Sequence, residues 1–328
     1  MPGRDEKLSL IIPVYRNEAN LPRLLTELEK LHSRMPCGFE VVCVVDGSPD
    51  RCHEILSREL PCRSFESRLL ALSRNFGSFS AVMAGMGAAT GDYCAVLAAD
   101  LQEPPELVLD FHRILSGGEA DIAFGVRASR SDPWLTELSS NLFWSIYRKL
   151  VVREMPPGGV DVFACTRAVR DEITRFRELN TNLIALLFWV GFRREYVPYE
   201  RRERLEGKSA WTFRKKLKYC MDSIFNFTEL PIRLLTNVGI VGIVLAVLVL
   251  MVVLAARLMG AIAVPGYAPI VLAITFFGAL TSFGLGIIGR YLWLTLENAR
   301  GRPGFIVASQ QNEAGSGGAA SATGQGIS

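Results

Sequence analysis

Polar side chains that could carry chemistry follow two short apolar runs of this 328-residue chain. Asp46 follows the run 39–45, and Asp100 and Gln102 follow the run 93–98. A carboxylate at the tip of a buried strand can hold a divalent cation, which neutralises a diphosphate as it leaves in a transfer reaction. Taken alone, an Asp just before a proline-initiated helix is more often a helix N-cap. Asp100 is therefore a candidate metal ligand whose neighbours must decide its role.

A second group of candidates is basic and lies between residues 201 and 218. Its members are Arg201, Arg202, Arg204, Lys208, Arg214, Lys215, Lys216 and Lys218. Guanidinium groups bind phosphate in a fork geometry, and a phosphate monoester can attack as an anion without a strong general base. The three histidines, His32, His53 and His112, are not part of any polar motif. These residues favour a phosphate-bearing acceptor, and the alternative is a solvated charge run or a topology signal.

Alternating short apolar runs and helical patterns predict the scaffold of these residues. Their order is typical of βαβ units on a mostly parallel sheet, so the predicted fold class is α/β. Ligands of such sheets bind beyond the carboxyl ends of the strands, where the polar clusters lie. The predicted strands are 8–14, 39–45, 69–73, 93–98 and 121–126, and the predicted helices are 21–33, 51–59, 79–89 and 105–116.

Two long intervals near the end of the chain lack charged residues. Residues 234–256 and 258–289 each exceed the roughly 20 apolar residues that one helical crossing needs, so we expect two transmembrane helices. Basic residues precede the first interval and follow the second, which places the catalytic domain and both termini in the cytoplasm. Arg257 lies on the opposite side, where its long side chain can reach the interface. The sequence thus predicts a multi-pass protein of the inner (plasma) membrane.

Three further segments could form amphipathic or apolar helices. In 139–152 and 211–227 apolar residues recur at helical spacing beside basic residues, whereas 182–192 is apolar but too short to cross a membrane. We expect them to lie in the headgroup layer, with core-facing helices as the alternative. The seven cysteines form no CxxC pair, and unpaired thiols in a reducing cytosol are expected. The expected divisions are a catalytic core (1–135), the rest of the catalytic domain with juxtamembrane helices (136–232), two spans (233–293), an exit segment (294–308) and a disordered tail (309–328).

Five motifs in a fixed order carry a family resemblance. They are Ser9 to Glu18 (SLIIPVYRNE), Val44 to Asp50 (VVDGSPD), Ser73 to Gly77 (SRNFG), Thr90 to Asp92 (TGD) and Ala99 to Glu106 (ADLQEPPE). The chain resembles family 2 glycosyltransferases of the Rossmann-like GT-A fold. Within them it is similar to the dolichol-phosphate mannose synthase branch, and to bacterial undecaprenyl-phosphate sugar transferases with two C-terminal spans.

The resemblance implies inverting transfer of a sugar from a nucleotide-diphosphate sugar, with UDP expected first, to polyprenyl phosphate. It implies Mg²⁺ or Mn²⁺ on Asp100 and Gln102, and catalytic roles for Asp100, Asp161 and Arg204. The implied donor-binding residues are Pro13, Tyr15, Glu18, Asp46, Asp100 and Gln102. The implied acceptor-phosphate residues are Arg127, Arg130, Arg201, Arg204, Lys208 and Ser209. By analogy a homotetramer is expected, and no nucleic-acid partner.

The chain departs from the family pattern at three positions. Ala98 and Val45 stand where the family often has Asp, and Ala164 stands where it often has Arg. The absent carboxylate at Ala98 supports a second hypothesis, a catalytically silent membrane scaffold that binds nucleotide or lipid. A third hypothesis is a processive polysaccharide synthase, which is disfavoured because a Gln-x-x-Arg-Trp pattern is absent.

Overall fold

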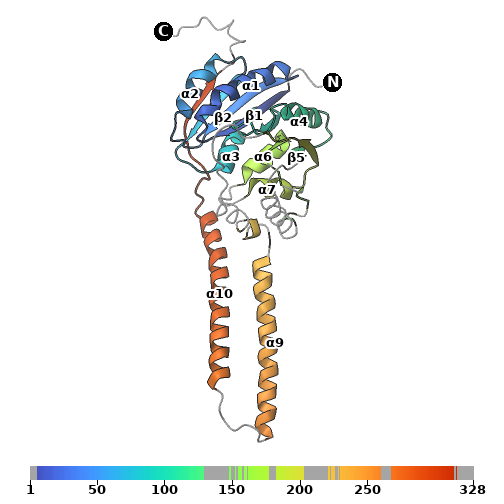
Figure 1. The fold of residues 1–328 in the computed structure, drawn as a ribbon, viewed down its shortest axis with the longest axis vertical. Helices are drawn as coiled ribbons and strands as arrows, with labels where there is room; N and C mark the ends of the chain where they lie inside the picture. Colours follow the sequence, from blue (N-terminus) through green and yellow to red (C-terminus); the bar gives the residue numbers. More distant parts are fainter. Residues whose placement is uncertain are drawn as a thin grey trace, which may run out of the picture. The chain divides into compact units, whose positions relative to one another are not determined.

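A computed structural model shows how the chain divides (Figure 1). It describes residues 6–128, 162–176, 182–202, 230–259 and 267–313, together with residue 315 and isolated residues within 148–160 and 221–228. One compact unit comprises residues 1–213 and 303–328, and the other comprises residues 214–302. The chain therefore leaves the first unit once and returns to it.

The first unit is built on one eight-stranded sheet of order β7-β5-β6-β4-β1-β2-β3-β8. The strands β1, β2, β3 and β4 are parallel to one another, while β6 and β8 run antiparallel to their neighbours. The strands are β1 (Lys7–Val14), β2 (Gly38–Val45), β3 (Glu66–Leu72), β4 (Tyr93–Val96), β5 (Ile122–Arg127), β6 (Val162–Thr166), β7 (Arg194–Tyr199) and β8 (Val307–Glu313). The predicted α/β class with a mostly parallel sheet is confirmed.

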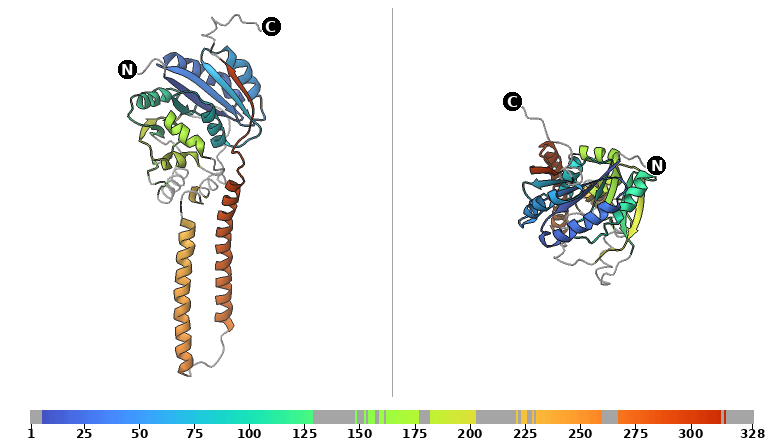
Figure 2. Two further views of the ribbon diagram at one scale, coloured as in Figure 1. Left: turned by 180° about the vertical axis from the view of Figure 1, so that it is seen from behind. Right: turned by 90° about the horizontal axis from the view of Figure 1, so that it is seen from above.

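Helices cover both faces of the sheet (Figure 2). They are α1 (Leu21–Arg34), α2 (Cys52–Glu59), α3 (Ser78–Ala88), α4 (Leu107–Ser116), α6 (Arg167–Arg175) and α7 (Leu183–Trp189). In α1 the buried leucines recur at helical spacing and Pro22 stands in the first turn, where a missing N–H costs nothing. Each of the four predicted helices has a counterpart among α1 to α4.

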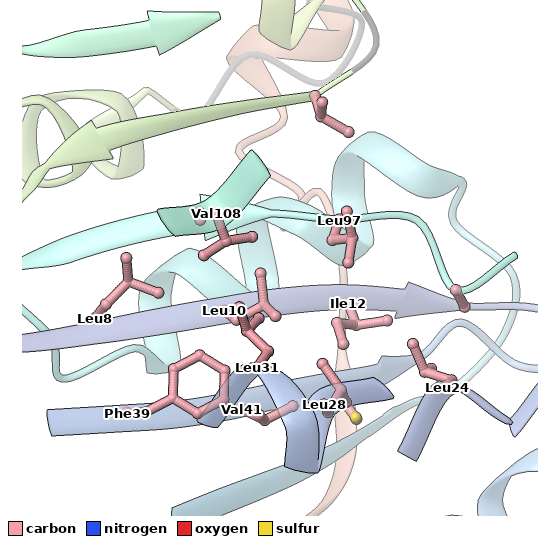
Figure 3. Close-up of a cluster of buried hydrophobic side chains, with 14 of the residues drawn as sticks. Leu8, Leu10, Ile12, Leu24, Leu28, Leu31, Phe39, Val41, Leu97 and Val108 are labelled. Atoms are coloured by element: carbon pink, nitrogen blue, oxygen red, sulfur yellow. The ribbon is translucent and has the colours of Figure 1, made fainter. Parts of the chain in front are cut away.

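The core follows from side chains that alternate along the strands. Leu8, Leu10 and Ile12 of β1 pack with Leu24 and Leu28 of α1 on one face (Figure 3). The opposite face receives α3 at very short range. A Cβ added at Gly85 would lie 2.4 Å from Ile11 Cγ2, so glycine is required for this close approach.

A charged residue is buried in the sheet and fully bonded. Glu40 of β2 is 1% exposed and accepts hydrogen bonds from Ser9 Oγ, Thr90 N, Thr90 Oγ1 and Arg68 Nε. Burial alone raises the pKa of Glu40, but the bonds from Ser9, Thr90 and Arg68, together with the charge of Lys7, outweigh it and lower the pKa below its usual 4.5. The ionised form is therefore stabilised by the fold.

The end of the sheet unit differs from expectation. Residues after 309 were predicted to be disordered, but Val307–Glu313 forms β8 and pairs antiparallel with β3 (Figure 2). The prediction was wrong for 309–313 because these polar residues form an exposed edge strand whose order comes from pairing and not from burial. The strands β6 and β7 were also not predicted.

One of the three expected headgroup-layer segments is placed in the core instead. Leu183 to Phe188 of α7 are all buried, and the Phe188 ring stacks on Phe124 of β5 at 4.8 Å. The alternative of a core-facing helix is therefore correct for 182–192. The segments 139–152 and 211–227 lie almost entirely outside the described residues.

The second unit contains two long helices that run side by side (Figure 1). They are α9 (Leu230–Leu258) and α10 (Tyr267–Ala299). A Cβ added at Gly284 of α10 would lie 3.3 Å from the Leu235 side chain of α9, so the two helices approach closely there. By length and composition, one helix among the described residues qualifies as a membrane span, Phe276–Ala299. This criterion of length and composition therefore supports one of the two expected spans.

We expect Glu40→Gln to destabilise the fold by about 3 kcal/mol or more at neutral pH, because it leaves Arg68 and Lys7 beside an uncharged amide. A lowered pKa means that the stabilisation is complete above pH 4.5 and is lost as the pH falls below that value. Thermal unfolding of the full chain in detergent across pH 3 to 8 measures the loss of stability in the variant and its pH dependence in the wild type, and it resolves differences of about 1 kcal/mol.

Glu66→Gln is the matched control, because Glu66 pairs with the same Lys7 but is 55% exposed. We expect this exposed pair to contribute less than about 1 kcal/mol. Equal midpoints for Glu40→Gln and Glu66→Gln would contradict a stabilising role for the buried network.

Candidate functional site

The candidate site lies at the carboxyl edge of the parallel strands, where the polar motifs begin. Two non-glycine residues among those the structure describes have a left-handed backbone, Arg16 with φ 54° after β1 and Leu101 with φ 55° after β4. Such conformations cost energy and cluster at functional sites. Both strained residues lie at the carboxyl edge of the sheet, so this edge is a candidate functional site.

Hydrogen bonds join the loop after β1 to the loop after β2. Arg16 N donates to Ser48 Oγ at 2.8 Å, and Glu18 N donates to Asp50 Oδ2 at 3.3 Å. Arg51 donates two hydrogen bonds to the Glu18 carboxylate, from Nε at 2.9 Å and from its backbone N at 3.1 Å. These bonds from Arg51 lower the pKa of Glu18. Glu18 therefore holds the two loops together as a carboxylate.

Asp46 connects the loop after β2 to the loop after β3. Its carboxylate is 3% exposed and accepts from Phe76 N at 2.7 Å and from Gly77 N at 2.9 Å. Gly47 follows with φ 55°, and a Cβ there would lie 2.3 Å from the backbone carbon of Arg74. The two loops are thus in backbone contact, and Asp46 positions residues 76 and 77.

The acidic turn after β4 is joined to the segment after β7. Gln102 N donates to Asp100 Oδ1 at 3.3 Å, and Gln102 Oε1 accepts from Arg201 Nη2 at 2.5 Å. Arg202 N donates to Gln102 O at 2.8 Å, and its guanidinium contacts Glu106 Oε2 at 3.3 Å. The structure therefore brings Arg201 into contact with Gln102, which lies 99 residues earlier in the chain and is itself bonded to Asp100.

The remaining expected residues divide into described and undescribed positions. Arg127 ends β5 directly opposite Tyr199 of β7, so it lies at the same edge as Arg201. Tyr15 is 38% exposed beside Arg16, whose guanidinium lies 5.4 Å from the ring centre, and Pro13 lies in β1. The residues Arg130, Asp161, Arg204, Lys208 and Ser209 lie outside the described residues.

A hollow of about 550 Å³ adjoins this edge between α4 and the end of β7. Its charged lining residues are Arg201, Arg202, Glu106, Asp110 and Glu200. Arg201 therefore bonds to Gln102 and also lines the hollow. A ligand carrying a phosphate could reach this guanidinium from the hollow.

The donor set for a divalent cation is only partly assembled. Asp100 supplies a strand-tip carboxylate, which suits Mg²⁺ or Mn²⁺ when phosphate oxygens complete the shell. The amide oxygen of Gln102 instead faces the guanidinium of Arg201 at 2.5 Å. Among the described residues, no group of three or more His, Cys, Asp or Glu side chains lies together. Asp100 fits such an ion, and Gln102 as placed here does not.

Sequence reasoning did not find the partners that fix the site. Arg51, Arg202 and Glu106 form ion pairs that no spacing rule reveals, because their partners lie on other loops. A signal existed for Glu106, which belongs to the ADLQEPPE motif. Burial raises the pKa of the Cys43 thiol to about 12, so this thiol is not a candidate nucleophile.

Comparison with known proteins places this geometry in a family. The sequence profile of glycosyl transferase family 2 matches residues 9–209, which include every described loop of the candidate site. An uncharacterised glycosyltransferase of Synechocystis sp. is 30% identical over 92% of this chain and 95% of its own length.

Two further relatives are also matched almost end to end. The undecaprenyl-phosphate 4-deoxy-4-formamido-L-arabinose transferase of Proteus mirabilis is 29% identical over 92% of this chain and 93% of its own. The bactoprenol glucosyl transferase of Shigella phage SfV is 26% identical over 94% of this chain and 100% of its own. The profile match covers more than half of the chain, and it includes the strand-end motifs. The chain therefore belongs to glycosyl transferase family 2 and is a glycosyltransferase.

Proposed function

We propose that this enzyme transfers a sugar from a nucleotide-diphosphate donor, with UDP expected first, to a polyprenyl phosphate. The observation that carries the proposal is that carboxylates and arginines both gather at the carboxyl edge. Asp46 and Asp100 follow β2 and β4, Arg127 ends β5, and Arg201 and Arg202 follow Glu200 after β7. A cation-binding carboxylate suits the leaving diphosphate, and arginines suit a second, attacking phosphate.

The arginines of the edge suit a phosphate-bearing acceptor. A polyprenyl phosphate is already an anion, so its oxygen can attack the anomeric carbon without a general base. Direct in-line attack inverts that carbon. We assign Arg127 and Arg201 to this phosphate, and Arg130, Arg204, Lys208 and Ser209 by resemblance. Asp161 is assigned by resemblance as an orienting residue.

The carboxylate side of the edge suits the donor. Pro13, Tyr15 and Glu18 border the base and ribose, and Asp46 acts by holding the loop 76–77 that closes this side. Asp100 would hold Mg²⁺ or Mn²⁺ together with the diphosphate oxygens of the donor. The ion would neutralise the charge that develops on the leaving group.

The relatives support the acceptor class. The Proteus mirabilis relative is named for undecaprenyl phosphate and the phage relative for bactoprenol, and each match covers more than nine tenths of both chains. The match therefore includes the second unit as well as the sheet. The sugar that each relative transfers differs by name, so the acceptor and not the sugar is the shared property.

A topological constraint supports two membrane crossings. Residues 303–313 rejoin the sheet as β8, beside β3. A single crossing between residues 213 and 303 would place β8 on the opposite side of the bilayer from β3, so the number of crossings must be even. α9 has 29 residues, roughly 43 Å at 1.5 Å per residue, and lacks charges from 234 to 256. We therefore propose that α9 and α10 both cross a core about 30 Å thick.

The orientation follows from charge. Arg214, Lys215, Lys216 and Lys218 precede α9, and Arg300 and Arg302 follow α10, while the connection 258–267 has none. Basic residues flank spans mainly on the cytoplasmic side, so the sheet unit faces the cytoplasm. The enzyme would then act at the inner face of the plasma membrane, where nucleotide sugars are available.

The function is tested with purified full-length protein in lipid nanodiscs, undecaprenyl phosphate and a panel of UDP-hexoses. We expect one lipid product that contains a single phosphate and one sugar of inverted configuration, identified by mass and by NMR of the anomeric proton. A polymer would favour a processive synthase. No product with any donor would contradict the proposal.

Asp100→Asn should reduce kcat/KM by about 100-fold or more, because it keeps the acceptor for Gln102 N but removes the charge that holds the cation. Asp171→Asn is the control. Asp171 lies in α6, which follows an antiparallel strand and therefore starts at the opposite edge of the sheet. Equal loss of activity in both variants, or none in Asp100→Asn, would refute the role of Asp100.

For topology, Gly266→Cys should react with a membrane-impermeant maleimide in intact cells. The wild-type chain is the control, since its exposed Cys62 belongs to the sheet unit and should react only after permeabilisation. A reporter should be fused after residue 328, because fusion within 307–313 would disrupt β8. Reaction of the new thiol only in permeabilised cells would refute the two-span arrangement.

A further inference from the structure

Gln102 is the point at which two loops of the site are tied together. It is 8% exposed, and each of its three polar groups named here bonds to a different partner. Its backbone N bonds to Asp100 Oδ1, its backbone O to Arg202 N and its side-chain oxygen to Arg201 Nη2. The first partner belongs to the loop after β4 and the other two to the segment after β7. Gln102 thus fixes the position of Arg201 relative to Asp100.

The partner of Arg201 differs in charge from the partners of two other arginines at this edge. Arg51 is held by the carboxylate of Glu18 and Arg202 by the carboxylate of Glu106, so those charges are neutralised locally. Arg201 is held by a neutral amide. A guanidinium has five N–H donors, and an amide oxygen can orient it without cancelling its charge. Its positive charge can therefore act on an anion.

We infer that Gln102 is a positioning residue, whose amide oxygen holds the charged Arg201 guanidinium toward a phosphate group of the transfer reaction. This inference rests on the proposed function. The phosphate belongs to the polyprenyl acceptor or to the diphosphate of the donor, and the shared chemistry is a pair of phosphate oxygens facing a guanidinium fork. The hollow of about 550 Å³ that Arg201 lines gives such a group room to approach.

This role differs from that of a metal ligand. A divalent cation bound to Gln102 Oε1 would lie next to the guanidinium that now contacts the same oxygen, and two like charges at that range repel. The two roles also predict opposite results for an added carboxylate. A carboxylate at position 102 would strengthen a metal site, but it would neutralise Arg201.

The test measures equilibrium binding of undecaprenyl phosphate and, separately, of UDP to the full chain in nanodiscs with a chelator present. We expect Gln102→Glu to weaken binding of one of the two phosphates about tenfold or more, since a charged hydrogen bond contributes roughly 1.5 to 3 kcal/mol. The arm that changes identifies the phosphate. Unchanged binding of both ligands would overturn the inference, and an altered affinity for Mn²⁺ in a separate titration without chelator would then favour a metal-ligand role.

A double-mutant cycle tests whether Gln102 acts through Arg201. Gln102→Ala should weaken phosphate binding in the wild-type chain and have no further effect in an Arg201→Ala chain. Additive losses would show that Gln102 acts independently, which also overturns the inference. Lipid product formed by the wild-type chain establishes the proposed function separately, so its failure is distinguishable from failure here.

Asp171→Asn is the control, because Asp171 lies in α6, which starts at the opposite edge of the sheet. We expect unchanged phosphate binding in this variant. Thermal midpoints of the Gln102 variants are measured in parallel. A binding loss in Gln102→Glu that is matched by a lowered thermal midpoint would attribute the effect to loop disruption and overturn the positioning role.

Discussion

The shared direction of the parallel strands is the constraint on which the site depends. Because β1, β2, β3 and β4 run the same way, their following loops emerge at one edge. Strand direction places the loops together but does not fix their side chains to within bonding distance. That precision comes from cross-bonds between loops, such as Asp46 to residues 76 and 77 and Glu18 to Arg51. Arg16, whose φ is 54°, takes part in the same cross-linking, because its backbone N donates to Ser48 Oγ at 2.8 Å.

The parts of the fold that sequence predicts are those whose apolar pattern is local. The strands β1 to β5 and helices α1 to α4 follow from runs and spacing within single segments. The strand β8 could not be predicted, because its residues are polar and exposed and its order depends on pairing with β3, more than 200 residues earlier in the chain. For the same reason the motifs identified Asp100 and Gln102 but not the contact of Gln102 with Arg201, which lies 99 residues away.

The pairing of β8 also limits what the helical unit can do. A chain that leaves the sheet unit and returns to it cannot cross a bilayer an odd number of times. Hydropathy judges each helix separately, so it detects Phe276–Ala299 and cannot register this coupling. The pairing of β8 with β3 thus constrains the proposed membrane topology in a way that the composition of the two helices alone does not. The polar, exposed residues of β8 suit an edge strand, because the strand pairs with β3 without contributing side chains to the core.

The partner of each arginine at the carboxyl edge determines whether its positive charge is neutralised. Arg51 and Arg202 are paired with carboxylates and serve to join loops, whereas Arg201 is held by an amide. An amide oxygen orients a guanidinium without cancelling its charge, whereas a carboxylate neutralises it. Of these three arginines, Arg201 is therefore the one whose charge can act on an anion in the hollow that it lines.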